Sequence, residues 1–152
     1  MNKRTGVFSV MLFCFVAMVA YGQDSFIRVE IKPEHAKVNN YVAFPVATTI
    51  RNTGAAEQSV KVWSCTFPTQ WVADNPLVHV NLVGCKKNEL VVVKLNSGKV
   101  LKKVLSVRVE LDPGGDPVES ATFRLGFKAA TFETGQENVP IWSQPVTVRV
   151  TK

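Results

Sequence analysis

Cysteine and histidine are the residue types in this 152-residue chain whose spacing could support chemistry. Two cysteines, Cys65 and Cys85, lie outside the N-terminal apolar run, and a chain that matures in an oxidising compartment joins such a pair as a disulfide. A redox pair is disfavoured because no Cys-x-x-Cys motif is present. A zinc site that also used His35 and His79 would need both thiols reduced. We therefore expect a structural disulfide between Cys65 and Cys85.

Enzyme motifs do not accompany these residues. The chain lacks the Gly-x-Ser-x-Gly, His-Glu-x-x-His and glycine-rich phosphate-binding patterns. His79 alternates with Val78 and Val80, which is typical of a surface residue on a strand, and His35 lies in a turn. The sequence leaves a Ser-His-Asp triad open, because its members need not be close in the chain. We expect a protein that is not an enzyme, with no catalytic residue and no cofactor.

The carboxylates of one loop are a second set of candidate metal ligands. Asp112, Asp116 and Glu119 could supply oxygen ligands to calcium. Their spacing is not that of an EF-hand, and the prolines and glycines of residues 112–117 explain the loop without an ion. Copper carriers use methionine together with histidine, but all three methionines lie in the first 22 residues. We expect no bound metal.

Two groups of side chains could contact a macromolecular partner. Phe67 and Trp71 lie in an expected loop at residues 66–76, where a disulfide-braced tryptophan would lose little entropy on binding. The alternative is that Trp71 folds back and covers the core. The second group is a basic patch near Cys85, and its alternative is a solvated strand edge where lysines prevent pairing with another strand. The lysines of this patch are Lys86, Lys87, Lys99, Lys102 and Lys103.

The first 22 residues have the form of a removable signal peptide. Two basic residues precede an almost wholly apolar run at residues 7–20, and small residues at 20 and 22 favour cleavage before Gln23. The run has about 14 residues and a helix needs roughly 20 to cross a bilayer, which disfavours an uncleaved membrane anchor. Cys14 lies inside the run, so we do not expect a lipoprotein. The expected location is periplasmic or extracellular, with no stable membrane span after cleavage.

Charge narrows the class of partner. Cleavage would lower the net charge from +6 to +4, because Lys3 and Arg4 leave and no acidic residue does. A surplus of this size favours anionic surfaces only slightly, and it is far from the charge of a nucleic-acid-binding domain. We expect a protein or an envelope component as partner, and no nucleic acid.

Apolar and polar residues alternate along the rest of the chain, which predicts half-buried strands. Pro45 predicts an edge or a bulge within its strand, and the Lys102-Lys103 pair predicts a second bulge. The valine-rich runs at residues 77–83 and 90–95 predict strands deep in the core. The expected strands are residues 27–31, 42–50, 60–65, 77–83, 90–95, 100–111, 121–128 and 146–151.

These seven or eight strands, with frequent turns and no helical periodicity, predict one all-β domain at residues 23–152, either a sandwich or a barrel. Three segments carry a resemblance: a strand and Asn-x-Gly turn at residues 44–54, a turn at residues 95–98 and a closing strand at residues 142–150. They resemble the immunoglobulin-like and adhesion-related domains of bacterial exported proteins. The resemblance implies a single immunoglobulin-like antiparallel β-sandwich.

The expected function is that of an exported, non-enzymatic immunoglobulin-like domain that binds a macromolecular partner in the cell envelope or exterior. The alternative is a small secreted inhibitor of a protease or wall-degrading enzyme that inserts the 66–76 loop into a cleft. A hydrolase with an unrecognised site is the third hypothesis. A protruding Trp71 would favour the inhibitor. A flat sheet face or a pairing edge would favour the binding domain, and a cleft that joins a histidine to a Ser, Asp or Glu would favour the hydrolase.

Overall fold

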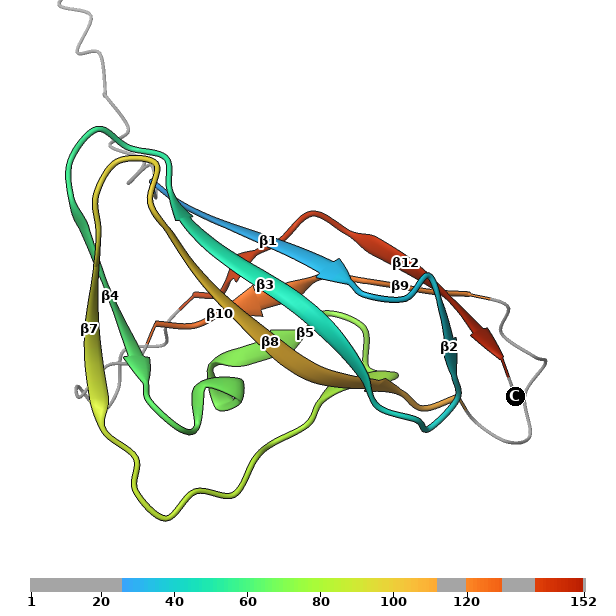
Figure 1. The fold of residues 1–152 in the computed structure, drawn as a ribbon. Coiled ribbons are helices and arrows are strands. Elements are labelled where there is room, and N and C mark those ends of the chain that lie inside the picture. The colour runs from blue at the N-terminus through green and yellow to red at the C-terminus, as the bar shows by residue number, and fades with distance from the viewer. Residues whose placement is uncertain (1–25, 112–119, 130–138, 152) are drawn as a thin grey trace, which may run out of the picture.

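Strands make up nearly all of the regular structure (Figure 1). The computed structural model describes residues 26–111, 120–129 and 139–151, so the predicted signal peptide lies outside the described residues. The predicted all-β class is confirmed. No helix among the described residues is long and apolar enough to cross a membrane. The elements are β1 (Ile27–Pro33), β2 (Lys37–Asn39), β3 (Phe44–Asn52), β4 (Gln58–Trp63), the 3-10 helix η1 (Phe67–Gln70), β5 (Trp71–Ala73), β6 (Val78–Val80), β7 (Leu90–Leu95), β8 (Val100–Val109), β9 (Ser120–Phe123), β10 (Leu125–Phe127), β11 (Ile141–Trp142) and β12 (Val146–Thr151).

A four-stranded antiparallel sheet has the order β1-β3-β8-β6. Alternate side chains of β3, from Phe44 to Asn52, are buried, as the two-residue period of a strand requires. The same alternation buries Leu105, Val107 and Val109 of β8. One face of this sheet therefore belongs to the core and the other faces solvent.

The remaining core strands form two three-stranded sheets, β11-β10-β5 and β2-β12-β9. β9 and β10 follow each other in the chain and are separated only at Arg124, so the two sheets are joined there. Every pairing is antiparallel except β2 with β12, which is parallel. Figure 1 shows β1, β3 and β8 crossing in front of these strands, and the core lies between. Phe123, Leu125 and Phe127 are among its fully buried side chains.

β4 and β7 form a separate antiparallel pair, here called the β4–β7 ribbon, which turns away from β3 and β8 (Figure 1). The completely buried Asn52 holds the corner. Its Nδ2 donates to the carbonyls of Ala56 (2.7 Å) and Leu95 (2.8 Å), and its Oδ1 accepts from the Gly54 N–H (2.8 Å). Donor and acceptor atoms of this buried amide are both paired, which fixes where the ribbon leaves the sheet.

Both predicted bulges are wrong, because β3 and β8 pair in one unbroken register. Pro45 lies in a central strand. The proline is tolerated because its nitrogen, which has no hydrogen to donate, faces β1 beyond the last pair of the β1–β3 ladder, Pro33 with Val46. Its carbonyl still accepts a hydrogen bond from the Glu34 N–H at 3.1 Å. Lys102 and Lys103 continue the ladder with β3 and are both exposed.

The predicted loop at residues 66–76 is wrong in part, because it contains η1 and β5. Pro68 lies in the first turn of η1, where the missing N–H of a proline leaves no helical bond unmade. β5 then pairs with β10, with Trp71 opposite Phe127. This regular structure turns the large apolar side chains of the segment inward.

Candidate functional site

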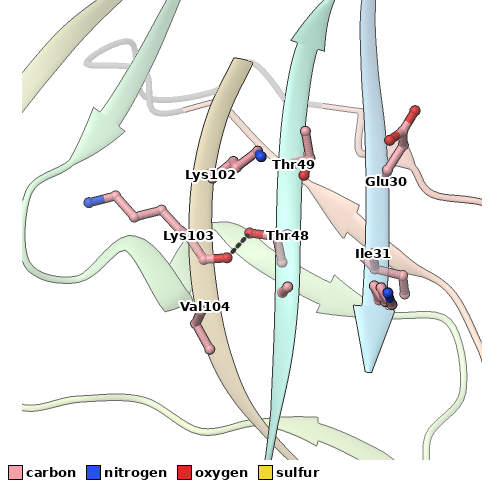
Figure 2. Close-up of a pocket in the computed structure, with 9 residues that line it drawn as sticks. Glu30, Ile31, Thr48, Thr49, Lys102, Lys103 and Val104 are labelled. Atoms are coloured by element: carbon pink, nitrogen blue, oxygen red, sulfur yellow. Dashed lines mark hydrogen bonds between the residues drawn. The ribbon is translucent and has the colours of Figure 1, made fainter. Parts of the chain in front are cut away.

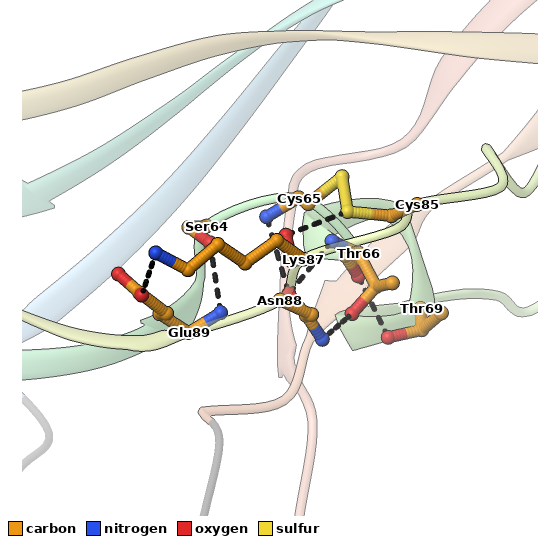
Figure 3. The surroundings of a disulfide bond; sticks show 8 residues. All are labelled: Ser64, Cys65, Thr66, Thr69, Cys85, Lys87, Asn88 and Glu89. Atoms are coloured by element: carbon orange, nitrogen blue, oxygen red, sulfur yellow. Dashed lines mark hydrogen bonds and ion pairs between the residues drawn. A yellow bond between two sulfur atoms is a disulfide. The ribbon is translucent and has the colours of Figure 1, made fainter.

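The predicted disulfide between Cys65 and Cys85 is confirmed (Figure 3). It joins the segment that follows β4 to the segment that precedes β7. Asn88 adds three hydrogen bonds across this junction: its Oδ1 accepts from the N–H groups of Cys65 and Thr66, both at 3.2 Å, and its Nδ2 donates to Thr66 Oγ1 at 2.6 Å. The start of β7 is therefore braced against the end of β4.

The edge of β4 that faces away from β7 is closed by one buried side chain, Gln70. Its Oε1 accepts from the Trp63 N–H at 2.8 Å. Its Nε2 donates to the carbonyls of Lys61 (3.2 Å) and Lys128 (3.0 Å). The amide thus takes the place of a neighbouring strand and ties the ribbon to the end of β10.

The opposite edge of the ribbon, along β7, is open. In an antiparallel pair, successive residues alternate between bonding their partner and pointing their backbone groups away from it. The Ser64 N–H donates to the Glu89 carbonyl at 2.8 Å, so odd-numbered residues of β7 bond β4 and even-numbered residues face outward. Within the described part of the chain, nothing pairs with the outward N–H and C=O groups of Leu90, Val92 and Lys94.

Most side chains of β7 are apolar and at least partly exposed, which the sequence did not predict. The valine-rich run predicted a buried strand, but Val91 is 41% exposed, Val92 is 52% exposed, and only Leu95 is fully buried. Lys94 is its one charged residue and pairs with Glu57 at 3.6 Å. An open, apolar edge of this kind is a template for pairing with another strand.

β8 has a second open edge, over residues 100–104. β6 pairs with β8 only near its end, and the last bond runs from the Asn81 N–H to the Ser106 carbonyl at 2.8 Å. By the same alternation, the N–H and C=O groups of Val100, Lys102 and Val104 face outward, and no described residue pairs with them. Here the edge carries two lysines, as protected edges do.

The outer surface beside this second edge is slightly hollowed (Figure 2). A shallow hollow of about 600 Å³ lies over β1, β3 and β8. Figure 2 shows Lys103 reaching away from β3, on the open side of β8, while Thr48 Oγ1 donates to its carbonyl at 3.0 Å. A smaller hollow of about 310 Å³ shares Val104 with the first. Neither hollow brings a histidine to a nucleophile.

Phe67 and Trp71, the predicted contact residues, are buried, with 6% and 4% of their surface exposed. Their ring centroids are 5.8 Å apart, and the Trp71 ring lies 5.3 Å from that of Phe127. Trp71 therefore does not protrude as a contact residue would, and the alternative that it covers the core is the one observed. Trp71 Nε1 has no hydrogen-bond partner in the described structure.

The predicted lysine patch does not form as one cluster. Lys86 and Lys87 precede β7, whereas Lys99 follows it, and the six residues of β7 span about 20 Å. Lys87 forms an ion pair with Glu89 at 2.9 Å in the segment that precedes β7, whereas Lys102 and Lys103 lie on β8. Lys86 and Lys87 thus form one set before β7, and a second set after β7 consists of Lys102 and Lys103 on β8 and Lys99 in the turn between the two strands.

Histidines and carboxylates show no reactive arrangement among the described residues. His79 is exposed on β6, as predicted, with its Nε2 3.5 Å from Glu110 Oε2, and His35 is exposed. No group of three or more His, Cys, Asp or Glu side chains that could hold a metal is found in the described ranges. The predicted calcium-loop residues, Asp112 to Glu119, lie outside them.

Asp74 is the one described group whose pKa is clearly shifted. Partial burial raises the pKa of this carboxyl, but hydrogen bonds from the backbone N–H (2.7 Å) and Nε (2.8 Å) of Arg124, with the attraction of its charge, lower it below the usual value. The Arg124 guanidinium also lies 5.3 Å from the centre of the Trp142 ring. These contacts hold the point where β9 meets β10.

Comparison with known proteins adds no relative. No protein-family model matches the chain, and no curated protein matches its sequence. Among the described residues, the feature best suited to binding is the open edge of β7, because its backbone groups and its apolar side chains are exposed together.

Proposed function

We propose that this chain is an exported, non-enzymatic immunoglobulin-like domain that binds a protein partner by pairing one strand of that partner with β7. The sheet order β1-β3-β8-β6, opposed by β5, the β9–β10 segment and β12, supports the immunoglobulin-like fold. The disulfide and the leader-like residues 1–22 support maturation in an oxidising compartment outside the cytoplasm.

The observation that carries the proposal is the edge of β7, where the outward backbone groups pair with no described residue and lie beside exposed valines. Three residues, Leu90, Val92 and Lys94, present N–H and C=O groups in the spacing that an added strand requires. Backbone hydrogen bonds would supply affinity, and side chains beside Val91 and Val92 would supply apolar contact.

The ribbon's construction favours this mode of binding. A two-stranded pair is marginal by itself, and a third strand adds stability. The disulfide and Asn88 hold β7 in place before a partner arrives, which lowers the entropy lost on binding. Burial of Phe67 and Trp71 removes the anchor that the inhibitor hypothesis needs.

Photo-crosslinking in the cells that make the protein tests the proposal. A photoreactive residue at position 91 should capture a protein partner, and the same residue at Thr122 on β9 should not. Val92→Pro should abolish capture from position 91, because it removes an outward N–H while leaving the bonds to β4 intact.

The matched control is Val104→Pro, which removes an outward N–H from the edge of β8. Capture from position 91 should be unchanged in this variant. Thermal unfolding of both proline variants checks that each is folded. Equal capture by the folded Val92→Pro variant and the original chain would contradict strand pairing at β7.

A further inference from the structure

Charge around the β4–β7 ribbon identifies the kind of strand that fits it. Residues 57–63 and 85–99, which contain the ribbon and its ends, carry five lysines and two glutamates, a surplus of three positive charges. Both glutamates are already engaged, Glu57 with Lys94 at 3.6 Å and Glu89 with Lys87 at 2.9 Å. Three lysines have no carboxylate within ion-pair distance among the described residues: Lys61, Lys86 and Lys99.

The positions of Lys61 and Lys94 place the charges of both side chains on one face of the ribbon. Directly opposed residues share a face, so Lys61 lies with Val92, and Lys94 lies on that same outer face two residues further along β7. The other face carries Val91 and Val93, which lie opposite the core residues Val62 and Val60 of β4. An added strand would therefore need polar or charged side chains on the outer face and apolar side chains on the other.

Building on the proposed function, we infer that the strand added to β7 belongs to an acidic, extended polypeptide segment. Its carboxylates lie on the outer face, beside Lys94 and within reach of the field of Lys61, because opposite charges on neighbouring strands stabilise a sheet. Its apolar side chains lie on the other face and cover the exposed part of Val91. Acidic and apolar residues thus alternate along the segment.

A second copy of this chain fits the edge less well. Pairing β7 with β7 of another molecule would bring a second surplus of three positive charges to the same sheet. The whole chain also has a formal charge of +6, which the expected cleavage would lower to +4, so two copies repel each other in either form. Charge complementarity therefore selects a different, acidic partner.

Binding of synthetic peptides to the oxidised protein, purified from its own cells, tests the inference. Three peptides of about eight residues, close to the length of a common strand, alternate valine with glutamate, glutamine or lysine. The glutamate peptide should bind about tenfold more tightly than the glutamine peptide, and the lysine peptide should not bind. Raising the salt concentration should weaken the glutamate peptide most.

Variants locate the effect on the ribbon. Lys94→Glu should abolish the preference for glutamate over glutamine, whereas Lys37→Glu, the same charge change on the exposed surface of β2, should leave it. Val92→Pro should abolish binding of every peptide, because its lost N–H serves all of them.

The possible outcomes separate this inference from the proposed function. Equal binding of the glutamate and glutamine peptides, lost in Val92→Pro, would overturn the acidic partner and leave strand pairing intact. Glutamate binding that persists in Val92→Pro would overturn both ideas. Absence of glutamate-peptide binding would overturn the acidic partner. A concentration-dependent dimer in sedimentation that Val92→Pro abolishes would identify a second copy as the occupant and would also overturn it.

Discussion

β7 and β8 are joined by one short turn, and each has an edge whose backbone pairs with no described residue, but the two edges are protected differently. β8 pairs with β3 along most of its length and carries Lys102 and Lys103 at its open part. β7 pairs only with β4 within the described structure, exposes valines beside a single lysine, Lys94, and follows a segment that a disulfide joins to the segment after β4. Neighbouring lysines at an edge discourage pairing, so the difference supports the proposal that β7 is the edge available for a partner.

Loss of the disulfide should have the largest effect on the free energy of unfolding, and it should affect β7 more than β8. Replacing both cysteines, Cys65→Ser with Cys85→Ser, should lower the free energy of unfolding by about 3 kcal/mol, since the bond closes a loop of about 20 residues. Urea denaturation measures the loss. Native-state hydrogen exchange should show faster exchange at the Val91 and Val93 amides than this global loss explains, with no extra loss at Leu105.

The control is the wild-type chain without reductant, measured under the same conditions. If β7 and β8 lose the same protection from hydrogen exchange beyond the global change, the disulfide does not stabilise β7 in particular.

Gln70→Ala should have the next largest effect, because it opens the other edge of the ribbon. The Trp63 N–H loses a bond of 2.8 Å, and the carbonyls of Lys61 and Lys128 lose their shared donor. We expect the free energy of unfolding to fall by about 2 kcal/mol. Hydrogen exchange should speed up in β4 and β7 and not in β8 beyond the global change.

Gln144→Ala is the matched control, since Gln144 is exposed and its substitution should change stability by less than about 0.5 kcal/mol. A similar loss in both variants would show that the Gln70 amide does not close the edge of β4.

Removal of the lysines on β8 should have the smallest effect on stability and the clearest effect on association. Lys102→Thr with Lys103→Thr should change the free energy of unfolding by less than about 0.5 kcal/mol, because both side chains are exposed. Without its charges the open edge should pair between molecules. Light scattering should then show association that the original chain lacks.

Lys37→Thr with Arg149→Thr removes the same charge from two exposed positions on paired strands, β2 and β12, and is the control. If this control also associates, net charge, and not the two lysines at the open edge of β8, keeps the molecules from associating.

Patterns in short stretches of the sequence predicted much of this fold. Alternation along residues 44–52 predicts a strand buried on one face, and β3 has that form. The count and context of the cysteines predict the disulfide. The parallel pairing of β2 with β12 depends on residues more than a hundred positions apart, so no local pattern reports it.

The candidate site was harder to predict, for a physical reason. An apolar run such as residues 90–95 has the same sequence pattern whether or not a second strand covers it. The open edge exists because β4 is the only described strand that pairs with β7. Trp71 could equally have packed or protruded until the fold of η1 was known. The two lysine sets separate because β7 lies between them, which is a property of tertiary arrangement.

Trp71 also gives the protein a built-in optical reporter. Its indole nitrogen is buried without a hydrogen-bond partner in the described structure, among Phe67 and Phe127, whereas Trp63 and Trp142 are only half-buried. An indole surrounded by rings and kept from mobile water has little solvent relaxation of its excited state, so its fluorescence is blue-shifted. The emission of this chain should therefore contain one blue component that follows the integrity of the core under β5 and η1.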